Sequence, residues 1–232
     1  MPGFARKRTR LAALRLIHRR KLLYPACVTI SSERVNSSNL LPRRLFAAGV
    51  YEAVELDEED LPALQAFFVA NPEYFQAVTG SPPRPDEARQ ELESRPPPSV
   101  PYDKVHILGF LDSSGQMVAM ASVMTGLLAP RVWHISLFIV ATALHGTGTA
   151  GLLYARLEKW AKDGGASWLR LGVVVGNLQA ERFWEKAGYK EVQRVPEQLG
   201  SMTHTSRVMI KPLGSLDVDE YLREVPRDRP KL

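Results

Sequence analysis

The chain has 232 residues, 45% of them hydrophobic, so it can bury a sizeable core in one domain or two. Its single cysteine, Cys27, excludes an internal disulfide framework and a cysteine-rich metal site, and it favours a reducing, cytoplasmic compartment. The formal net charge of +5 is unevenly spread, because residues 1–50 hold 11 Lys or Arg and one acid, whereas residues 51–232 hold 19 Lys or Arg and 24 Asp or Glu. We therefore expect a mildly acidic domain behind a basic extension, which argues against nucleic-acid binding by the domain itself.

Two further classes of protein are not favoured. No apolar run approaches the roughly 18 residues of a membrane-spanning helix, and the longest candidate, residues 132–144, contains His134. The five histidines show neither HxxxH nor HExxH spacing, so no metal site is predicted.

Residues 1–50 are interpreted as a basic N-terminal extension that is flexible or outside the fold. No acid precedes Glu33, and residues 11–17 have the pattern of a basic amphipathic helix. Three interpretations compete: a start codon assigned too far upstream, a basic arm that contacts nucleic acid, lipid or a partner, and an organelle-type presequence. The short apolar stretch and the missing cleavage pattern argue against a secretory signal.

Regular elements are predicted from Tyr51, because residues 51–56 alternate in polarity as a strand does. Three helices follow. The first begins in the acidic run at Asp57 with Pro62 in its first turn, the second begins at Asn71, and the third lies between two proline clusters.

The rest of the chain alternates between strands and helices. In chain order, the predicted elements are three strands (105–111, 117–127 and 132–140), a helix (149–163), a strand (168–175), a helix after residue 177, and two strands (189–195 and 205–211). This order predicts one α/β (α+β) domain over residues 51–215, with antiparallel and parallel pairs in one sheet. Residues 216–232 are interpreted as a charged C-terminal tail.

A Gly-rich turn, His145-Gly-Thr-Gly-Thr-Ala-Gly151, joins the strand over 132–140 to the next helix. Such a turn leaves backbone N–H groups unpaired and lets a ligand approach closely, which is typical of a phosphate-binding loop. Its glycines also match the G-x-G-x-x-G dinucleotide fingerprint. That fingerprint needs its first glycine directly after the strand and an acid near the end of the next strand. Neither condition is met in this sequence. A nicotinamide or flavin site is therefore not favoured.

A second motif accounts for more of the chain. His145-x-x-Gly148-x-Ala150 resembles the [Gln/Arg]-x-x-Gly-x-[Gly/Ala] motif of the GCN5-related N-acetyltransferases, the GNAT superfamily. Downstream, Asn177-x-x-Ala180-x-x-Phe183-Trp184-x-x-x-Gly188-Tyr189 resembles a further segment of that family. The resemblance covers residues 51–213 and keeps the family's order of strands and helices.

The resemblance implies a GNAT fold, with a mixed sheet of about seven strands, helices on both faces, and a fourth and fifth strand that splay apart. It also implies acetyl-CoA as co-substrate, with the pyrophosphate on the Gly-rich turn and the pantetheine arm along the splayed strand. Asn177 is expected to reach that arm near the acetyl end. The cofactor-binding residues implied are Phe138, Ile139, Val140, His145, Gly146, Thr147, Gly148, Thr149, Ala150, Gly151, Asn177 and Phe183.

Three positions depart from the family pattern, and one of them, Thr142 where a proline is frequent, is expected to change little. His145 replaces the usual Gln or Arg; it can donate to a phosphate, and the alternative is a solvent-facing loop histidine. Trp184 stands where many members carry the tyrosine that protonates the leaving thiolate, and an indole cannot act as that acid. We expect Trp184 to pack in the core.

Acetyl transfer to an amine needs a group that takes the proton of the ammonium. His134 and Ser136 share one face of their strand, so His134 is a candidate base and Ser136 a candidate water-positioning residue; the alternative is a histidine with no role in catalysis. Glu73, Tyr74 and Tyr102 are candidates for acceptor binding, with ordinary surface or packing roles as the alternative.

The function expected from these features is N-acetyl transfer from acetyl-CoA to a primary amine of a small molecule or peptide, by direct attack. An acyl-CoA-binding sensor or scaffold without turnover is the alternative, because Trp184 replaces the tyrosine. A nucleic-acid-associated protein that works through its basic tail is a second alternative. We expect a monomer or homodimer without membrane contact.

Overall fold

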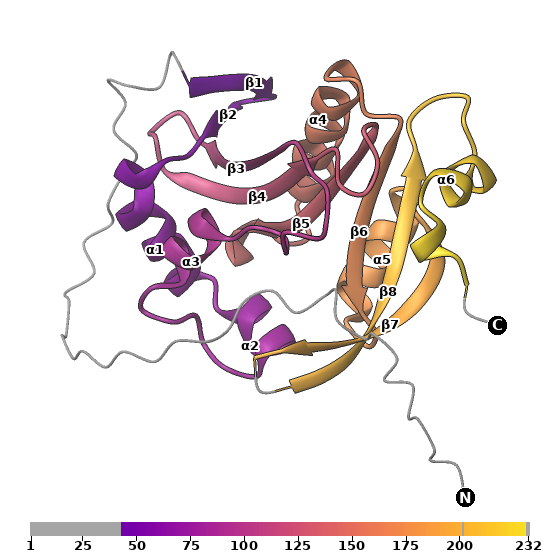
Figure 1. Cartoon of the computed structure of the whole chain (residues 1–232). Coiled ribbons are helices and arrows are strands. Elements are labelled where there is room, and N and C mark those ends of the chain that lie inside the picture. Colours follow the sequence, from indigo (N-terminus) through magenta and orange to yellow (C-terminus); the bar gives the residue numbers. More distant parts are fainter. Residues whose placement is uncertain (1–42, 201, 231–232) are drawn as a thin grey trace, which may run out of the picture.

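The computed structural model describes residues 43–200 and 202–230, which form an eight-stranded sheet covered by helices on both faces (Figure 1). The order across the sheet is β1-β2-β3-β4-β5-β6-β8-β7, and the β5–β6 pair alone is parallel among these neighbours. The strands are β1 (Arg44–Ala48), β2 (Tyr51–Glu55), β3 (Lys104–Leu111), β4 (Met117–Thr125), β5 (Val132–Val140), β6 (Trp168–Val174), β7 (Lys190–Leu199) and β8 (Met202–Pro212). The predicted mixed sheet is confirmed.

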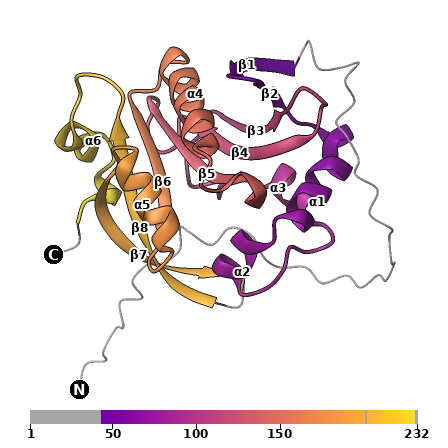
Figure 2. The ribbon, with the colours of Figure 1, turned by 180° about the vertical axis from the view of Figure 1, so that it is seen from behind.

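Two layers of helices enclose the sheet, and Figure 2 shows the α4–α5 side. Apolar side chains of α1 and α2 pack with one face in a core cluster that includes Phe68, Phe75 and Met120, whereas α4 and α5 pack on the other face around Leu153, Leu157 and Trp184. The helices are α1 (Leu61–Ala70), α2 (Glu73–Thr79), α3 (Glu87–Glu93), α4 (Thr149–Asp163), α5 (Leu178–Lys186) and α6 (Val218–Glu224), with short 3-10 turns η3 (Glu58–Asp60), η4 (Thr142–Leu144) and η5 (Pro226–Asp228).

The parallel β5–β6 pair separates along its length, as the resemblance implied. The two strands pair over four positions, from Val132 with Trp168 to Ile135 with Leu171. Beyond them, β5 continues to Val140 with β4 as its one paired neighbour, while β6 continues to Val174 against β8. The edge of β5 from Ser136 onward therefore faces an open wedge.

The ordered elements extend beyond the predicted domain at its N-terminal end. Arg44–Ala48 form β1, although they fall in the predicted extension, because Phe46 packs on Phe110 and Trp160, and Arg43 forms ion pairs with Asp57 and Asp60. This strand makes the sheet eight-stranded rather than seven-stranded. Residues 1–42 lie outside the described residues.

The predicted C-terminal tail also contains ordered structure. Asp217 and Glu220 form a capping box that starts α6, and Tyr221 and Asp228 are completely buried. The segment is anchored because the Asp228 carboxylate pairs with Arg170 of β6 at 2.7 Å. Residues 217–228 are therefore part of the packed structure.

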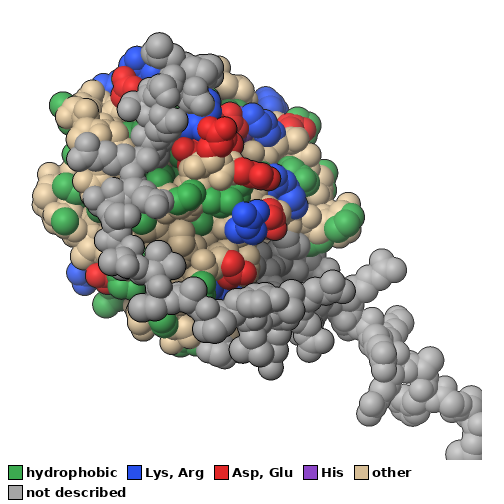
Figure 3. All heavy atoms as spheres, turned by 90° about the vertical axis from the view of Figure 1, so that its left-hand side faces the viewer, with side chains coloured by type: hydrophobic (Ala, Val, Ile, Leu, Met, Phe, Trp, Pro, Cys, Tyr) green, Lys and Arg blue, Asp and Glu red, His purple; other side chains and the backbone are tan. Residues whose placement is uncertain are grey.

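The surface over α1 and α3 mixes both signs of charge. Acidic and basic side chains lie beside one another on the side that is at left in Figure 1 (Figure 3), and ion pairs such as Arg84–Glu87 and Arg89–Glu93 come from α3 and the turn before it. Among the described residues, no helix has the length and apolar character to cross a membrane.

Candidate functional site

The Gly-rich turn requires glycine at two of its positions. Gly146 and Gly148 have φ of +78° and +86°, the left-handed region that side chains with a Cβ rarely adopt. A Cβ placed on either residue, or on Gly151, meets no atom within 4 Å, so the space above the turn is open. The backbone of the turn is thus exposed to any ligand above it.

Several N–H groups at the start of α4 have no backbone partner. Gly148 is the N-cap, and the first intrahelical bond is the one from Leu152 N–H to the Gly148 carbonyl. Thr149 N–H donates to the side chain of Thr147 at Oγ1, whereas the N–H groups of Ala150 and Gly151 have no partner in the described part of the chain, as the geometry of a helix start dictates. With the positive end of the helix dipole, these groups make an anion-binding site.

A cleft of about 770 Å³ lies beside this turn, between α4, α5 and the C-terminal half of β5. We call it the α4–α5 cleft. Thr147 and Thr149 are absent from its wall, and their hydroxyls bond to each other at 2.8 Å. The other cofactor-binding candidates line it: Phe138, Ile139, Val140, His145, Gly146, Gly148, Ala150, Gly151, Asn177 and Phe183.

His145 is fixed within this wall by the backbone of β5. Its Nε2 lies 3.0 Å from the Val140 carbonyl oxygen, so Nε2 carries the proton and donates, and Nδ1 remains available for the cleft. The residue is nevertheless exposed, so a solvent-facing loop histidine and a phosphate-binding histidine both stay open as interpretations of His145. Thr142 on the same loop is tied to α2, since its hydroxyl donates to Glu73 at 2.6 Å and its N–H to Asn71.

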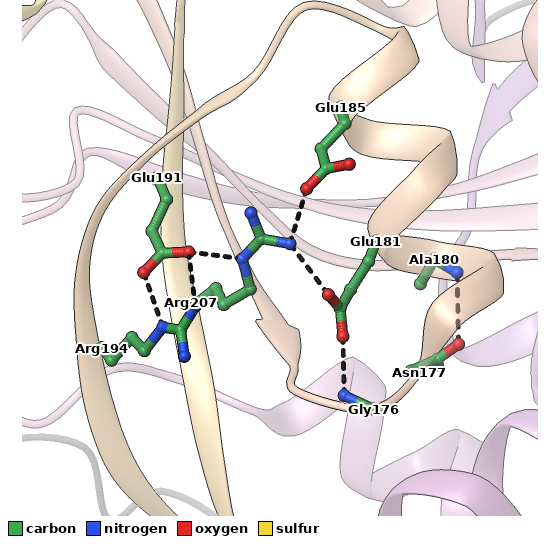
Figure 4. Close-up of polar contacts among 8 residues, drawn as sticks. All are labelled: Gly176, Asn177, Ala180, Glu181, Glu185, Glu191, Arg194 and Arg207. Atoms are coloured by element: carbon green, nitrogen blue, oxygen red, sulfur yellow. Dashed lines mark hydrogen bonds and ion pairs between the residues drawn. The ribbon is translucent and has the colours of Figure 1, made fainter.

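Asn177 caps α5 and still has a free donor for the cleft. Its Oδ1 accepts from Ala180 N–H at 3.2 Å, while Nδ2 has no partner among the described residues (Figure 4). Arg207 of β8 holds this helix by ion pairs with Glu181 and Glu185, and it also pairs with Glu191 of β7. Glu181 also accepts from Gly176 N–H, so the turn before Asn177 is held as well.

Trp184 packs in an aromatic cluster at the base of the cleft. Its ring lies 5.2 Å from that of Tyr154 and 5.3 Å from that of Tyr189, and the residue is 8% exposed, as expected for core packing. Its Nε1–H has no partner within the described residues, and the residue lines both the cleft and the β5–β6 gap defined below. Tyr154 donates to Tyr189 at 3.2 Å, and burial raises the pKa of both hydroxyls.

Two smaller cavities continue from the cleft to the other face of the sheet. One of about 210 Å³ fills the wedge between the splayed strands and is called the β5–β6 gap. The other, of about 280 Å³, lies between α2, α3 and β5 and is called the α2–α3 cavity. Tyr74 lines all three spaces, and Asn177 and Phe138 line both the cleft and the gap.

The three acceptor-binding candidates separate in the structure. Tyr74 lies in the wall of the α2–α3 cavity. Glu73 lines the α4–α5 cleft but neither of the other two spaces, and the Thr142 hydroxyl lowers the pKa of its carboxyl group. Tyr102 lines none of the three spaces and lies in the segment that precedes β3, so we do not retain it as an acceptor-binding residue.

His134 and Ser136 both line the gap and the α2–α3 cavity, so the structure places them on one face of β5. His134 Nδ1, however, lies 3.3 Å from an Arg170 Nη1 that can only donate. Burial, followed by the charge of Arg170, lowers the pKa of His134 to about 3. The imidazole is therefore neutral and its one lone pair is occupied, so we do not retain His134 as the base.

Two carboxylates at this site were not singled out from the sequence. Glu91 of α3 and Glu197 of β7 line the α2–α3 cavity, and Glu197 also lines the gap. Burial and the nearby carboxylates Glu91, Glu197 and Glu87 raise the pKa of Tyr74, so these groups face its hydroxyl. Within the described residues neither Glu91 nor Glu197 forms an ion pair; their partners are the hydroxyls of Ser122 and Ser206.

The fold and the site together define an acyltransferase-like architecture: a splayed parallel pair with an anion-binding turn on one side and, on the other, a cavity whose wall contains glutamates and arginines. The sequence model of the acetyltransferase (GNAT) family matches residues 54–189. The chain belongs to this family.

Relatives and solved structures agree with that assignment. An uncharacterized N-acetyltransferase of Mycobacterium bovis is 31% identical over 99 residues, which are 43% of this chain and 62% of the relative. The chain therefore matches less than two thirds of that relative's length. An acetyltransferase structure from Thermus thermophilus superposes with a TM-score of 0.55 at 17% identity, covering 72% of this chain and 99% of the other.

A second solved structure is a spermidine N-acetyltransferase from Vibrio cholerae in complex with CoA and spermine. It has a TM-score of 0.54 and 15% identity over 71% of this chain and 96% of its own. At such identities the likeness to both structures shows the fold alone.

Proposed function

We propose that this protein transfers an acetyl group from acetyl-CoA to a primary amine by direct attack. The observation that carries the proposal is the series of three spaces with shared walls, from the open Gly-rich turn through the β5–β6 gap, where Glu197 lies, to the α2–α3 cavity. A long anionic cofactor and a cationic acceptor would enter from opposite faces of the sheet and meet at the gap.

The cofactor side supplies donors in the order that acetyl-CoA needs them. Free N–H groups of Ala150 and Gly151 bind the pyrophosphate, and His145 Nδ1 beside them donates to a phosphate oxygen only when the ring carries its second proton. The unpaired edge of β5 from Ser136 to Val140 pairs with the amides of the pantetheine arm as an added strand does. Asn177 Nδ2 reaches the end of that arm.

The acceptor side supplies the charge and the proton path. Glu197 lies in the gap and attracts an ammonium, and its carboxylate, bonded to Ser206, receives the proton that the amine must lose before attack. The amine nitrogen then forms a bond to the thioester carbon, the carbon–sulfur bond breaks and sulfur leaves as a thiolate, while the nitrogen releases its second proton to that thiolate or to solvent. Trp184 Nε1–H can donate a hydrogen bond to that thiolate but cannot protonate it.

The second candidate function is acyl-CoA binding without turnover. It is favoured by Trp184 at the tyrosine position and by the buried, mutually bonded hydroxyls of Tyr154 and Tyr189. Release of CoA thiol from acetyl-CoA, measured against a panel of primary amines, separates the two functions. We expect amine-dependent release; acetyl-CoA binding with no release above the rate without amine would favour the sensor or scaffold.

The acceptor is a small molecule or a peptide amine in this proposal. The Vibrio cholerae structure was solved with CoA and spermine, which supports a cationic acceptor for this fold. A cytoplasmic location and a monomeric or homodimeric state are the accompanying expectations, to be tested by fractionation and light scattering.

A further inference from the structure

The α2–α3 cavity has two ends that differ in charge, and both Tyr74 and His134 line it. At one end, burial raises the pKa of the Tyr74 hydroxyl, and the charged groups that act on it besides are Glu91, Glu197 and Glu87. At the other end, burial lowers the pKa of His134, and the charged groups that act on the ring are Arg170, Asp228 and Arg227. The two sets share no member, so an occupant of the cavity meets carboxylates at one end and guanidinium groups at the other.

The carboxylate end has groups available for a cation. Glu87 is paired with Arg84 at 2.9 Å, whereas Glu91 and Glu197 form no ion pair within the described residues and bond to serine hydroxyls. Glu197 also lines the β5–β6 gap, and the proposed function assigns the reacting ammonium to it. The amine of an acceptor therefore belongs at this end.

At the other end, one carboxylate faces two guanidinium groups. Asp228 accepts from Arg170 at both oxygens, at 2.7 and 3.3 Å, and it also accepts from the Tyr221 hydroxyl and the Gln193 amide. Arg227 Nε lies 3.9 Å from the same carboxylate, which is beyond hydrogen-bond distance. The Arg227 guanidinium has no hydrogen-bond acceptor among the described residues, so this end of the cavity carries one positive charge that no carboxylate compensates.

Arg227 is placed where an anion can reach it. Its side chain is 33% exposed, and the residue lines the α2–α3 cavity but neither the gap nor the cleft. Its backbone carbonyl accepts from Gln193 Nε2 at 3.0 Å, which holds η5 against β7. A guanidinium presents N–H donors in a planar fork, and a carboxylate can accept two of them at once. This end of the cavity therefore fits an anionic group better than a neutral one.

The strand register gives the separation of the two ends. Arg227 is bonded to Gln193, and Glu197 lies four residues further along β7 with no register shift between them. This even spacing puts both β7 side chains on one face, and at about 3.3 Å per residue the two levels are about 13 Å apart. Two hydrogen bonds of about 3 Å each leave about 7 Å for the acceptor. Because three bonds of an extended chain span about 3.8 Å, about four or five methylenes fill that length.

We propose that Arg227 is a specificity-determining residue that binds a carboxylate of the acceptor, at the end remote from the reacting amine, while Glu197 holds the ammonium. This inference rests on the proposed amine acetylation and names its substrate class: a zwitterionic ω-amino carboxylate with about four or five methylenes between its two charged groups. A diamine of the same length would bring its second ammonium to the Arg227 guanidinium and be repelled.

The test compares three acceptor series on the full chain: ω-amino carboxylates with one to seven methylenes, the carboxamides with the same heavy atoms, and diamines of the same length. Thiol release from acetyl-CoA gives kcat/KM for each. We expect the carboxylates with four or five methylenes to exceed their carboxamides and diamines by about 10- to 100-fold, the factor that a charge-assisted hydrogen bond supplies. Equal values for carboxylate and carboxamide at every length, or a preference for diamines, would overturn the proposal.

Two variants and a control identify the cation. Arg227→Met removes the charge at similar length, so the carboxylate-to-carboxamide ratio should fall to about one. Arg227→Lys keeps the charge without the planar fork and should retain a higher ratio than Arg227→Met. Arg223→Met makes the same charge change at an exposed position of α6 that lines none of the three spaces, and it should keep the wild-type ratio. The proposal is wrong if the ratio survives Arg227→Met, falls as far in Arg223→Met, or is no higher in Arg227→Lys than in Arg227→Met.

The failure of the proposed function is distinguishable from the failure of this inference. The proposed function fails if no amine in any series releases thiol. The inference is then judged by calorimetric titration of the carboxylates with four and five methylenes, and of their carboxamides, into the full chain with CoA present. Tighter binding of a carboxylate that Arg227→Met abolishes supports the inference. Equal binding of carboxylate and carboxamide, or no binding of either, overturns it.

Discussion

The α4–α5 cleft and the α2–α3 cavity meet at one splayed strand pair, but different parts of the chain build them. The cleft relies on backbone: the free N–H groups at the start of α4, the open edge of β5, and the glycines that keep the turn exposed. The cavity relies on side chains from distant segments, such as Tyr74, Glu91, His134, Glu197 and Arg227. Backbone sites of this kind are set by local sequence, whereas the cavity depends on the whole tertiary fold.

The largest effect should come from the buried pair beneath the cavity. Arg170→Met leaves the completely buried Asp228 carboxylate without its cation, so the free energy of unfolding should fall by about 3–5 kcal/mol. Lys159→Met removes the exposed partner of Asp163 on α4. This change should alter the free energy of unfolding by less than about 0.5 kcal/mol. Urea unfolding of both variants measures the difference. Similar effects of the two changes would show that residues 217–228 do not support the cavity.

This contrast also explains which features the sequence could reveal. The Gly-rich turn and Asn177 were predictable because their signals are a strand, a turn and a helix start within a few residues. The neutral state of His134 could not be predicted from the sequence, because it depends on Arg170 and Asp228. These residues are remote in sequence and adjacent in the fold. The role of Glu197 likewise depends on β7 extending to Leu199, four residues past the predicted strand.

The two chain ends were misjudged for a compositional reason. Arg44 continues the basic composition of the extension before it, so composition alone does not separate residues 44–48 from that extension. The C-terminal segment did carry a local signal, because Asp217 followed three residues later by Glu220 has the spacing of a capping box. Its burial, however, is a tertiary property that composition does not show.

The next largest effect should be on turnover with little change in cofactor affinity. Glu197→Gln removes the charge that attracts the ammonium and the carboxylate that takes its proton, so kcat/KM for the amine should fall about 10- to 100-fold. Glu93→Gln, on the exposed side of α3, is the matched control. Isothermal titration with CoA should give wild-type affinity in Glu197→Gln. A parallel loss of CoA affinity would place Glu197 on the cofactor side and contradict the division between the two regions.

A smaller effect should appear in the pH dependence of stability. Because the pKa of His134 is lowered to about 3 in the fold, the unfolded chain binds more protons than the folded one below about pH 6.5. Stability is therefore lost as the pH falls from about 6.5 toward 3. Between pH 7.5 and 5 the wild type should lose about 2 kcal/mol more than His134→Gln, which has no titrating ring. If the free energy of unfolding changed with pH in parallel for the two proteins, His134 would not be held neutral by its surroundings.

The smallest effect is the sharpest test of the backbone side. Gly148→Ala and Gly165→Ala each force a Cβ onto a residue with positive φ, +86° and +95°, and neither Cβ meets an atom within 4 Å. The backbone strain is thus matched, and each substitution should cost about 1–2 kcal/mol of stability.

The two substitutions differ in position: the Gly148 Cβ projects into the space where the pyrophosphate would lie, whereas Gly165 follows α4 at its other end. We expect Gly148→Ala alone to weaken CoA binding, by about tenfold or 1.4 kcal/mol, as measured by calorimetric titration. If the two variants bound CoA equally well, the open space above the turn would have no part in holding the cofactor, and the free N–H groups of Ala150 and Gly151 would lose their proposed role.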